Sequence, residues 1–346
     1  SGATGVEIGL KMAVQYWQLK GETKRTHVAS LAESYHGDTV GAMSMGYSDT
    51  FHRFHKSLLF PVLRLTPPHM FRYLKRASEE EALKSALREA EEKLTQKQRS
   101  LAALVIEPLM QGAAGMWSQP SGFVSALREM CRRNSILFIA DEVATGFGRT
   151  GRMFACEHED VRPDILCLGK GITGGYLPVA ATITTEEIFS AFLGEYKEFK
   201  TFFHGHTYTG NPLGCSVALA SLELFKQEAI IERMQPKIDY LKHRLKQEFL
   251  PLAHVADVRQ WGFMVGIELA VNKDERRSYS PETRMGHKVI LEARKRGVLI
   301  RPLGDVIILM PPLTIADSEL KTLLDVTYDS IRAVTETQGS RIEDRE

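Results

Sequence analysis

The chain has 346 residues, of which 43% are hydrophobic and 25% are charged, a composition that can form one large core or two cores of ordinary domain size. Its 44 lysines and arginines nearly balance its 43 aspartates and glutamates, which excludes the strongly basic surface typical of proteins that bind nucleic acids or anionic membranes. No apolar run approaches the roughly 20 residues that a membrane-spanning helix requires. We therefore expect a soluble protein whose partners are small molecules or another protein.

The cysteines and the start of the chain bear on where the protein acts. Four cysteines stand far apart and without metal-ligand spacing, as expected of reduced thiols inside a cell and of small core residues: Cys131, Cys156, Cys167 and Cys215. The chain opens on Ser1-Gly2-Ala3 without a methionine and enters a helical pattern at once, which indicates an N-terminally truncated protein that could have lost a targeting segment. We expect a cytoplasmic location and no metal site.

Residues 1–225 alternate short apolar runs with helical patterns, which is typical of an α/β domain with a mainly parallel sheet flanked by helices. Most of the runs are apolar on both faces, as in buried parallel strands: residues 28–31, 103–106, 136–140, 165–168 and 179–182. Between residues 77 and 97, leucine and alanine recur at helical spacing opposite a charged face. This pattern predicts a surface helix.

The pattern changes after residue 225, and we predict a smaller C-terminal α+β domain over residues 226–346. Helices are expected at residues 230–249, 285–295 and 317–334, and strands at residues 255–260, 263–269, 298–301 and 306–310. Gly262, Gly297 and Gly304 mark turns between these elements.

The apolar run at residues 136–140 ends abruptly in two carboxylates, Asp141 and Glu142, followed by the glycine-bearing stretch VATGFGRTG. Ligands of open α/β sheets bind at such strand ends. A carboxylate there is costly unless a cation pairs with it, and a protonated pyridine nitrogen is one such cation. The acidic pair could equally bind magnesium or cap a helix.

A second apolar run, at residues 165–168, ends in Gly169-Lys170-Gly171. A lysine after a buried strand could be a solvated surface residue, or a Schiff-base nucleophile that is kept partly desolvated. Lys170 follows Asp141 by about one strand–helix–strand unit. That spacing would bring both side chains to one end of one sheet.

Two aromatic rings, Tyr35 and His36, follow the apolar run at residues 28–31. The ring of Tyr35 could stack on a flat cofactor, or it could merely pack over the strand end. His36 could be a metal ligand or a plain loop histidine, and no second histidine stands at ligand spacing.

A phosphate group needs backbone N–H donors, and two glycine-bearing turns before helical patterns offer them. One is residues 1–4 and the other is residues 204–212, which include Gly205. Helix N-termini bind anions well. Together with Lys170 and Asp141, these turns indicate a cofactor that carries phosphate.

With these stretches assembled, the chain resembles the class III (ω-type) pyridoxal-phosphate (PLP) aminotransferases of fold type I from end to end. The resemblance rests on VEIGLKMAVQYW at residues 6–17, YHGDT at 35–39, DEVATGFGRTG at 141–151, Gly169-Lys170 and HTYTGNPLGC at 206–215. Within that family the chain looks most like the members of biotin biosynthesis. Those enzymes convert 7-keto-8-aminopelargonate to 7,8-diaminopelargonate with S-adenosylmethionine or lysine as the amino donor.

The resemblance also implies roles for single residues. Lys170 would form the internal aldimine with PLP and move the proton, and Asp141 would pair with the pyridine nitrogen. Thr207 would reach the phosphate of the neighbouring subunit's cofactor, which implies a homodimer with shared active sites, and Arg301 would bind the carboxylate of the keto substrate. The implied cofactor-binding residues are Gly2, Ala3, Tyr35, His36, Asp141, Lys170 and Thr207. The implied substrate-binding residues are Tyr35, Lys170, Gly205 and Arg301.

The same residues bear on other substrates and roles. Ala113 stands where family members that act on ornithine or γ-aminobutyrate usually carry glutamate, which argues against those substrates. A broad-specificity ω-amino acid/amine:pyruvate aminotransferase would share all the cofactor residues. A non-catalytic scaffold of the same fold would suit a chain without the family's N-terminal segment, but it would have no need of Lys170.

Overall fold

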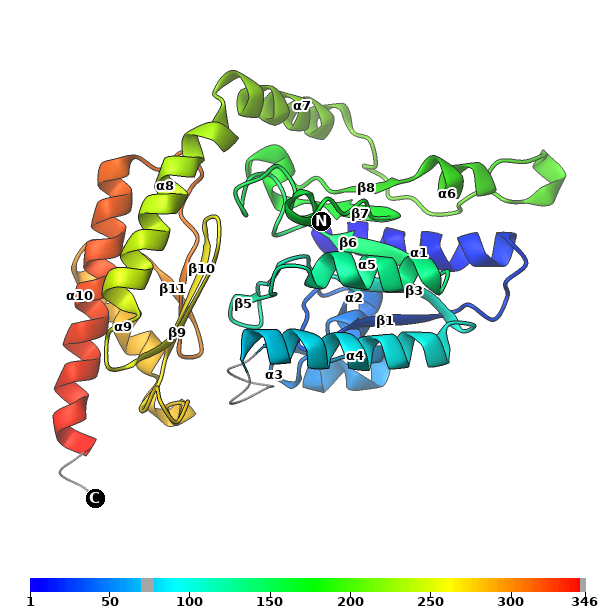
Figure 1. The fold of residues 1–346 in the computed structure, drawn as a ribbon. Coiled ribbons are helices and arrows are strands. Elements are labelled where there is room, and N and C mark those ends of the chain that lie inside the picture. Colours follow the sequence, from blue (N-terminus) through cyan, green and yellow to red (C-terminus); the bar gives the residue numbers. More distant parts are fainter. Residues whose placement is uncertain (70–77, 343–346) are drawn as a thin grey trace. The chain divides into compact units, whose positions relative to one another are not determined.

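The structure is a computed structural model that describes residues 1–69 and 78–342. Backbone contacts divide the chain, drawn in Figure 1, into two compact units. Unit 1 comprises Ser1–Gly112, Gln119–Phe147 and Arg152–Glu228, and unit 2 comprises Ala113–Ser118, Gly148–Gly151 and Ala229–Glu346. We predicted a single domain boundary after residue 225. That boundary places Ala113–Ser118 and Gly148–Gly151 in the first domain, whereas the backbone contacts place both segments in unit 2.

Unit 1 is built around a six-stranded sheet in the order β2-β1-β3-β6-β7-β8. Its strands are β1 (His27–Leu31), β2 (Leu63–Leu65), β3 (Leu101–Ile106), β6 (Leu137–Asp141), β7 (Ile165–Leu168) and β8 (Ala181–Thr184). All neighbouring strands are parallel except β7 and β8. The carboxyl ends of β1, β3, β6 and β7 therefore meet at one edge of the sheet, where ligands of such sheets bind.

Two strands of this sheet differ from the sequence prediction. We expected a strand at residues 179–182, and β8 instead begins at Ala181 and runs antiparallel to β7. The chain between these strands holds only the short η3 (Lys170–Thr173), so it lacks the helical crossover that usually joins parallel strands. The three-residue strand β2 was not predicted, because Arg64 interrupts its apolar pattern.

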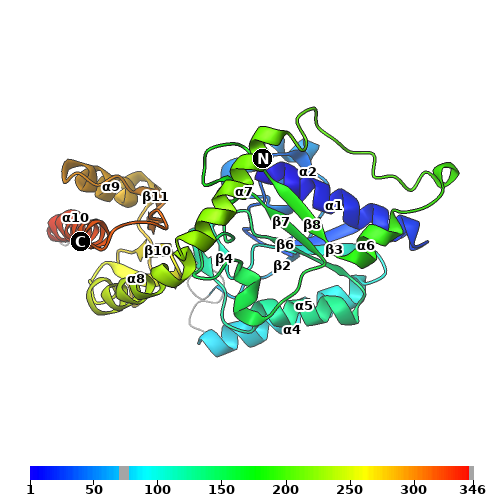
Figure 2. The same ribbon diagram turned by 90° about the horizontal axis from the view of Figure 1, so that it is seen from above.

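Helices cover both faces of this sheet, with α1 and α2 on one face and α4 and α5 on the other (Figure 2). A Cβ at Gly9 would lie 3.1 Å from Sγ of Cys167, so glycine there allows α1 to pack closely on β7. The predicted surface helix over residues 77–97 is observed as α4, and residue 77 lies outside the described residues. The helices of unit 1 are α1 (Gly2–Leu19), α2 (Val40–Met45), α3 (Asp49–His52), η1 (Arg53–Leu58), α4 (Glu79–Lys97), α5 (Phe123–Arg133), η2 (Ala155–Glu159), η3 (Lys170–Thr173), α6 (Glu186–Ala191), η4 (Tyr196–Glu198) and α7 (Pro212–Gln227). None of the helices in residues 1–69 and 78–342 is both long and apolar enough to cross a membrane.

Unit 2 contains an antiparallel four-stranded sheet in the order β11-β12-β10-β9, which confirms the predicted smaller C-terminal α+β part. Its elements are α8 (Ile230–Arg244), η5 (Leu245–Phe249), β9 (Val255–Trp261), β10 (Met264–Leu269), η6 (Pro281–Thr283), α9 (Met285–Lys295), β11 (Arg301–Leu303), β12 (Val306–Leu309) and α10 (Asp317–Ile342). Two further short strands are β4 (Met110–Gln111) in unit 1 and β5 (Trp117–Ser118) in unit 2. The strand predicted at residues 298–301 is observed later, because a tight turn at Gly304 (φ 60°) sets its pairing with β12. Arg301 therefore begins this strand instead of ending it.

Candidate active site

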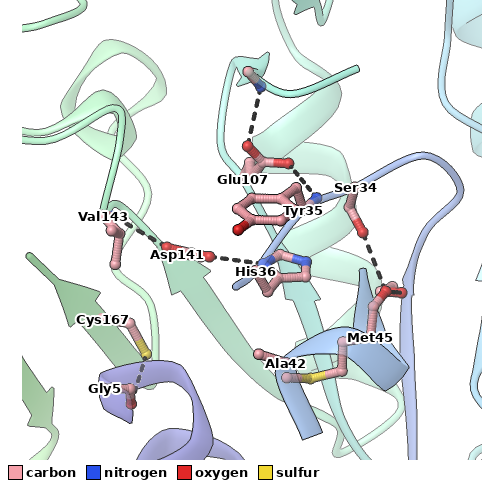
Figure 3. A network of polar contacts seen from close by, with 12 residues as sticks. Gly5, Ser34, Tyr35, His36, Ala42, Met45, Glu107, Asp141, Val143 and Cys167 are labelled. Atoms are coloured by element: carbon pink, nitrogen blue, oxygen red, sulfur yellow. Dashed lines mark hydrogen bonds and ion pairs between the residues drawn. The ribbon is translucent and has the colours of Figure 1, made fainter. Parts of the chain in front are cut away.

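Asp141 is the last residue of β6, and only 4% of its surface is exposed. Its Oδ2 lies 2.7 Å from Nδ1 of His36, and its Oδ1 accepts a hydrogen bond from the backbone N–H of Val143 at 3.0 Å. Figure 3 shows the side chains of His36 and Asp141 directed at each other. Since an ionised carboxylate only accepts hydrogen bonds, Nδ1 of His36 carries the proton. This hydrogen bond offsets the free-energy cost of burying a carboxylate at a strand end.

His36 is therefore the polar partner of Asp141. The sequence had suggested a metal ligand or a plain loop histidine, and neither interpretation predicted this contact. Its side chain is buried, and the two residues are far apart in the chain. A direct contact of His36 with a cofactor remains a prediction.

Lys170 is at the same end of the sheet as Asp141, because β6 and β7 are neighbouring parallel strands with Asp141 opposite Cys167. Lys170 begins η3 directly after Gly169, and its side chain is exposed. Its backbone φ of 40° lies in the left-handed region, which is uncommon for a residue with a side chain and often marks a functional site. The structure thus brings the carboxylate and the amine to the same edge of the sheet.

The first turn of α1 meets this edge. A Cβ at Gly2 would lie 2.4 Å from Cγ1 of Val143, and a Cβ at Gly169 would lie 3.3 Å from Cα of Gly2. Gly37, which has a φ of 117°, approaches so closely that a Cβ there would lie 2.3 Å from Cβ of Ala3. The helix start, the loop after β1 and the ends of β6 and β7 therefore converge, and only residues with minimal side chains fit between them.

Tyr35 makes two hydrogen bonds, and its ring lies beside that of His52. Its backbone N–H donates to Oε1 of Glu107 at 2.9 Å, and its hydroxyl donates to Oδ2 of Asp38 at 2.9 Å. Its ring is nearly parallel to that of His52, with the centroids 6.2 Å apart and an interplanar angle of 8°. Burial, together with Asp38, raises the pKa of the Tyr35 hydroxyl to about 12, so the hydroxyl remains a donor at neutral pH.

Glu107 is a member of the site that the sequence analysis missed. It follows β3 directly, and only 4% of its surface is exposed. Its carboxylate accepts the N–H of Tyr35 (Figure 3) and that of Gly112. Burial raises its pKa to about 7; the nearby His36 opposes this shift and Asp141 adds to it. The signal was present, since Glu107 ends an apolar run as Asp141 does.

Glu142, the second carboxylate of the acidic pair, has a different environment. It is fully buried and accepts hydrogen bonds from the backbone N–H groups of Ala155 and Cys156 at 2.6 and 2.9 Å. Burial raises its pKa above the ordinary value. Glu142 thus caps η2, one of the alternatives that we had kept open for the pair, whereas Asp141 faces His36.

Three residues of the predicted site lie elsewhere in the chain. Gly205 and Thr207 are exposed in the segment before α7, and no hydrogen bond or ion pair within the described ranges joins them to Asp141 or Lys170. Arg301 is exposed at the start of β11 in unit 2. The roles of all three remain predictions.

The sequence profile of the family described as aminotransferase class-III matches residues 1–331. The chain belongs to this family. Among curated relatives, the adenosylmethionine-8-amino-7-oxononanoate aminotransferase of Nitratidesulfovibrio vulgaris is 50% identical over 338 residues, which are 97% of this chain and 62% of that enzyme. The enzyme of the same name from Aquifex aeolicus is 50% identical over 96% of this chain and 73% of its own length. The chain thus spans less than two thirds of the first of these relatives.

Solved structures agree with this assignment. The adenosylmethionine-8-amino-7-oxononanoate aminotransferase of Methanocaldococcus jannaschii superposes with a TM-score of 0.89 at 45% identity, over 96% of this chain and 74% of that one. A PLP-bound amine transaminase from an uncultivated Pseudomonas species gives a TM-score of 0.90 at 36% identity, over 96% and 76%. The predicted fold type I architecture, a mainly parallel sheet flanked by helices with a smaller C-terminal part, is confirmed.

Proposed function

We propose that this chain carries the core of a PLP-dependent aminotransferase that converts 7-keto-8-aminopelargonate to 7,8-diaminopelargonate in biotin biosynthesis. The observation that carries the catalytic part is the buried Asp141, paired with His36, at the same sheet edge as the exposed amine of Lys170. The substrate is supported by the names of curated relatives that are 46–50% identical.

The residues at this edge fit PLP. Asp141 offers a negative charge to a protonated pyridine nitrogen, and Lys170 offers an exposed amine to the aldehyde. The first N–H groups of α1, from Gly2 onward, have no acceptor within the helix; the Ser1 side chain does not cap them, and no acidic residue stands in the first turn. Such a helix start favours a phosphate group. The ring of Tyr35 offers a flat surface to the cofactor ring.

The reaction assigns a task to each of these side chains. When bound, PLP draws electrons away from the substrate carbon that loses its proton. His36 donates to Asp141 and stabilises the negative charge that faces the pyridine nitrogen. Nζ of Lys170 would remove the proton from the donor's carbon in the first half-reaction, and would deliver a proton to the corresponding carbon of the acceptor in the second. Arg301 would bind the carboxylate of the keto acid, the role that the family resemblance implies, because its planar guanidinium matches a carboxylate in shape.

Replacing Lys170 tests the catalytic assignment. Lys170→Ala is expected to abolish turnover and the visible absorption band expected of the wild-type protein with PLP, because the amine that would bond to the cofactor's aldehyde is removed. Lys97→Ala, on the last turn of the surface helix α4, is the matched control and should keep both. Normal turnover by Lys170→Ala would refute the assignment. Absence of the band from the wild type would favour a non-catalytic scaffold.

The same absorption band identifies the amino donor, and product formation identifies the acceptor. Bleaching of the band by S-adenosylmethionine or by lysine, each in its own cuvette, identifies the donor. A second candidate is a broad-specificity amine:pyruvate aminotransferase, which the similarity to the Pseudomonas amine transaminase supports. Amination of pyruvate by simple diamines, without amination of 7-keto-8-aminopelargonate, would favour that candidate.

We also propose that the protein acts as a homodimer. The 16-residue helix α7 buries only Gly214 and Ala218, whereas Leu213 and Leu219 are 74% and 68% exposed. Cys215 on the same helix is exposed, in contrast to our expectation of a core residue. Apolar side chains gathered at a surface mark interaction sites, and Thr207, just before this helix, is predicted to reach a neighbouring subunit. The cytoplasmic location inferred from the cysteines remains a prediction.

A further inference from the structure

We propose that Glu107 is a positioning residue of the active site, whose carboxylate anchors the backbone of Tyr35 and Gly112 and so fixes the Tyr35 ring and its neighbour His36. This inference rests on the proposed function only for its effect on turnover. The anchoring itself is a property of the chain without any cofactor.

The carboxylate uses both of its oxygens on backbone donors. Oε1 accepts the N–H of Tyr35 at 2.9 Å, and Oε2 accepts the N–H of Gly112 at 3.0 Å. Tyr35 lies in the loop after β1, and Gly112 follows the short strand β4. One side chain therefore links two segments that are far apart in the sequence, since Tyr35 and Gly112 are separated by 77 positions.

Glu107 is itself rigidly held. Its backbone carbonyl accepts a hydrogen bond from Nε2 of Gln119 at 2.8 Å, and Oε1 of the same amide accepts the N–H of Leu109 at 2.9 Å. Gln119 is buried, and its backbone N–H donates to the carbonyl of Leu109. These hydrogen bonds matter because a mobile carboxylate could not fix the position of the loop that it binds.

The position of Tyr35 in the chain explains why one backbone hydrogen bond matters. Tyr35 carries the ring predicted to cover the cofactor, and the next residue, His36, carries the donor to Asp141. A shift of the Tyr35 backbone would therefore move the ring and the partner of Asp141 together. A displacement of about 1 Å in the groups that position the reacting atoms is enough to slow an enzyme substantially.

The choice of a carboxylate follows from its hydrogen-bonding capacity. Two backbone N–H groups converge on the side chain, and the ionised carboxylate accepts from both without presenting a donor. A glutamine of the same size would accept one bond and direct its NH₂ group at the other N–H. Glu107→Gln thus keeps the volume and removes one anchor point.

Hydrogen–deuterium exchange of the cofactor-free protein tests the anchoring directly. In Glu107→Gln, at least one of the amides of Tyr35 and Gly112 is expected to exchange at least about tenfold faster, while amides of the sheet strands keep their rates. Glu159→Gln is the matched control, since Glu159 also accepts two backbone N–H groups, from Gly122 and Ser125, but at the start of α5. Wild-type exchange at both Tyr35 and Gly112 in Glu107→Gln would overturn the proposal.

Two further measurements separate positioning from general stability. With PLP, Glu107→Gln should bind the cofactor at least about fivefold more weakly and shift the pH titration of its visible band, whereas Glu159→Gln should match the wild type in both. Equal effects of the two variants would overturn the proposal. If Glu107→Gln does not fold, Glu107→Asp serves instead: it keeps the charge but is one methylene shorter, so faster exchange of at least one of the two amides is required. A wild type that binds no PLP refutes the proposed function alone, because the exchange data still decide the anchoring.

Discussion

Asp141 and His36 show at the scale of single residues how a buried charge is kept in place. Asp141 accepts two hydrogen bonds, from the Nδ1–H of His36 and from the backbone N–H of Val143. Removal of one partner of a buried polar pair costs more than the pair contributes, because the remaining group stays desolvated. The pair is therefore a sensitive point of the site.

His36→Phe keeps a ring at this position but removes the Nδ1–H donor. We expect it to lower the free energy of unfolding by about 1–3 kcal/mol and to weaken PLP binding, as measured by urea unfolding and by titration of the visible band. His27→Phe, at the exposed first residue of β1, is the control and should change neither quantity. A stable His36→Phe protein with normal PLP affinity would show that Asp141 does not depend on this histidine.

Glu107 predicts a dependence of stability on pH. Burial raises its pKa from 4.5 to about 7, with Asp141 adding to the shift and His36 and the two N–H donors opposing it. Because the folded-state pKa is the higher one, the folded state binds the proton more tightly, and this stabilisation is present below about pH 4.5 and lost as the pH rises through about 7. Relative to Glu107→Gln, which does not titrate, the wild type should lose up to about 3 kcal/mol between pH 4.5 and 8. Urea unfolding of both proteins across this range measures the difference; a constant difference would contradict the shift.

At the scale of elements, the site depends on how closely the segments behind it pack. Gly46 ends α2, and a Cβ there would lie 2.8 Å from the backbone N of His36 and 2.9 Å from Cα of Tyr35. Backbone atoms cannot rotate away as a flexible side chain can, so the loop after β1 would have to move.

Gly46→Ala is therefore expected to destabilise the protein by roughly 1–3 kcal/mol and to lower PLP affinity, since it displaces Tyr35 and His36. Thermal unfolding and titration of the visible band measure the two effects. Gly5→Ala is the control, because a Cβ at Gly5 would make only ordinary contacts of 3.5 Å or more. Gly46→Ala with wild-type stability and affinity would mean that this loop tolerates displacement.

At the scale of the whole molecule, α7 leaves apolar side chains exposed along most of its length. If this surface binds a second copy of the chain, Leu213→Glu combined with Leu219→Glu should convert a dimer into a monomer in sedimentation equilibrium, because two charges would be buried in the interface. Leu250→Glu, at a partly exposed leucine after η5, is the control and should stay dimeric. A monomeric wild type would refute the homodimer.

The sequence by itself determined the order and type of most elements, because apolar runs and helical periodicity are local properties of the chain. It also placed Asp141 and Lys170 at strand ends, and parallel strands bring their carboxyl ends to one edge. The sequence pattern did not predict the direction of β8, because that direction depends on how residues 169–180 turn. The shifted start of β11 was likewise decided by pairing across a turn.

Only the tertiary structure decided the partners of the buried polar groups. His36 meets Asp141 across 105 residues of chain, and Tyr35 meets Glu107 across 72. No local pattern encodes such distances, because they depend on which strands become neighbours in the sheet. The residue types that carry the chemistry can thus be recognised along the chain, whereas the hydrogen bonds that hold them in place arise only when β1, β3 and β6 lie side by side.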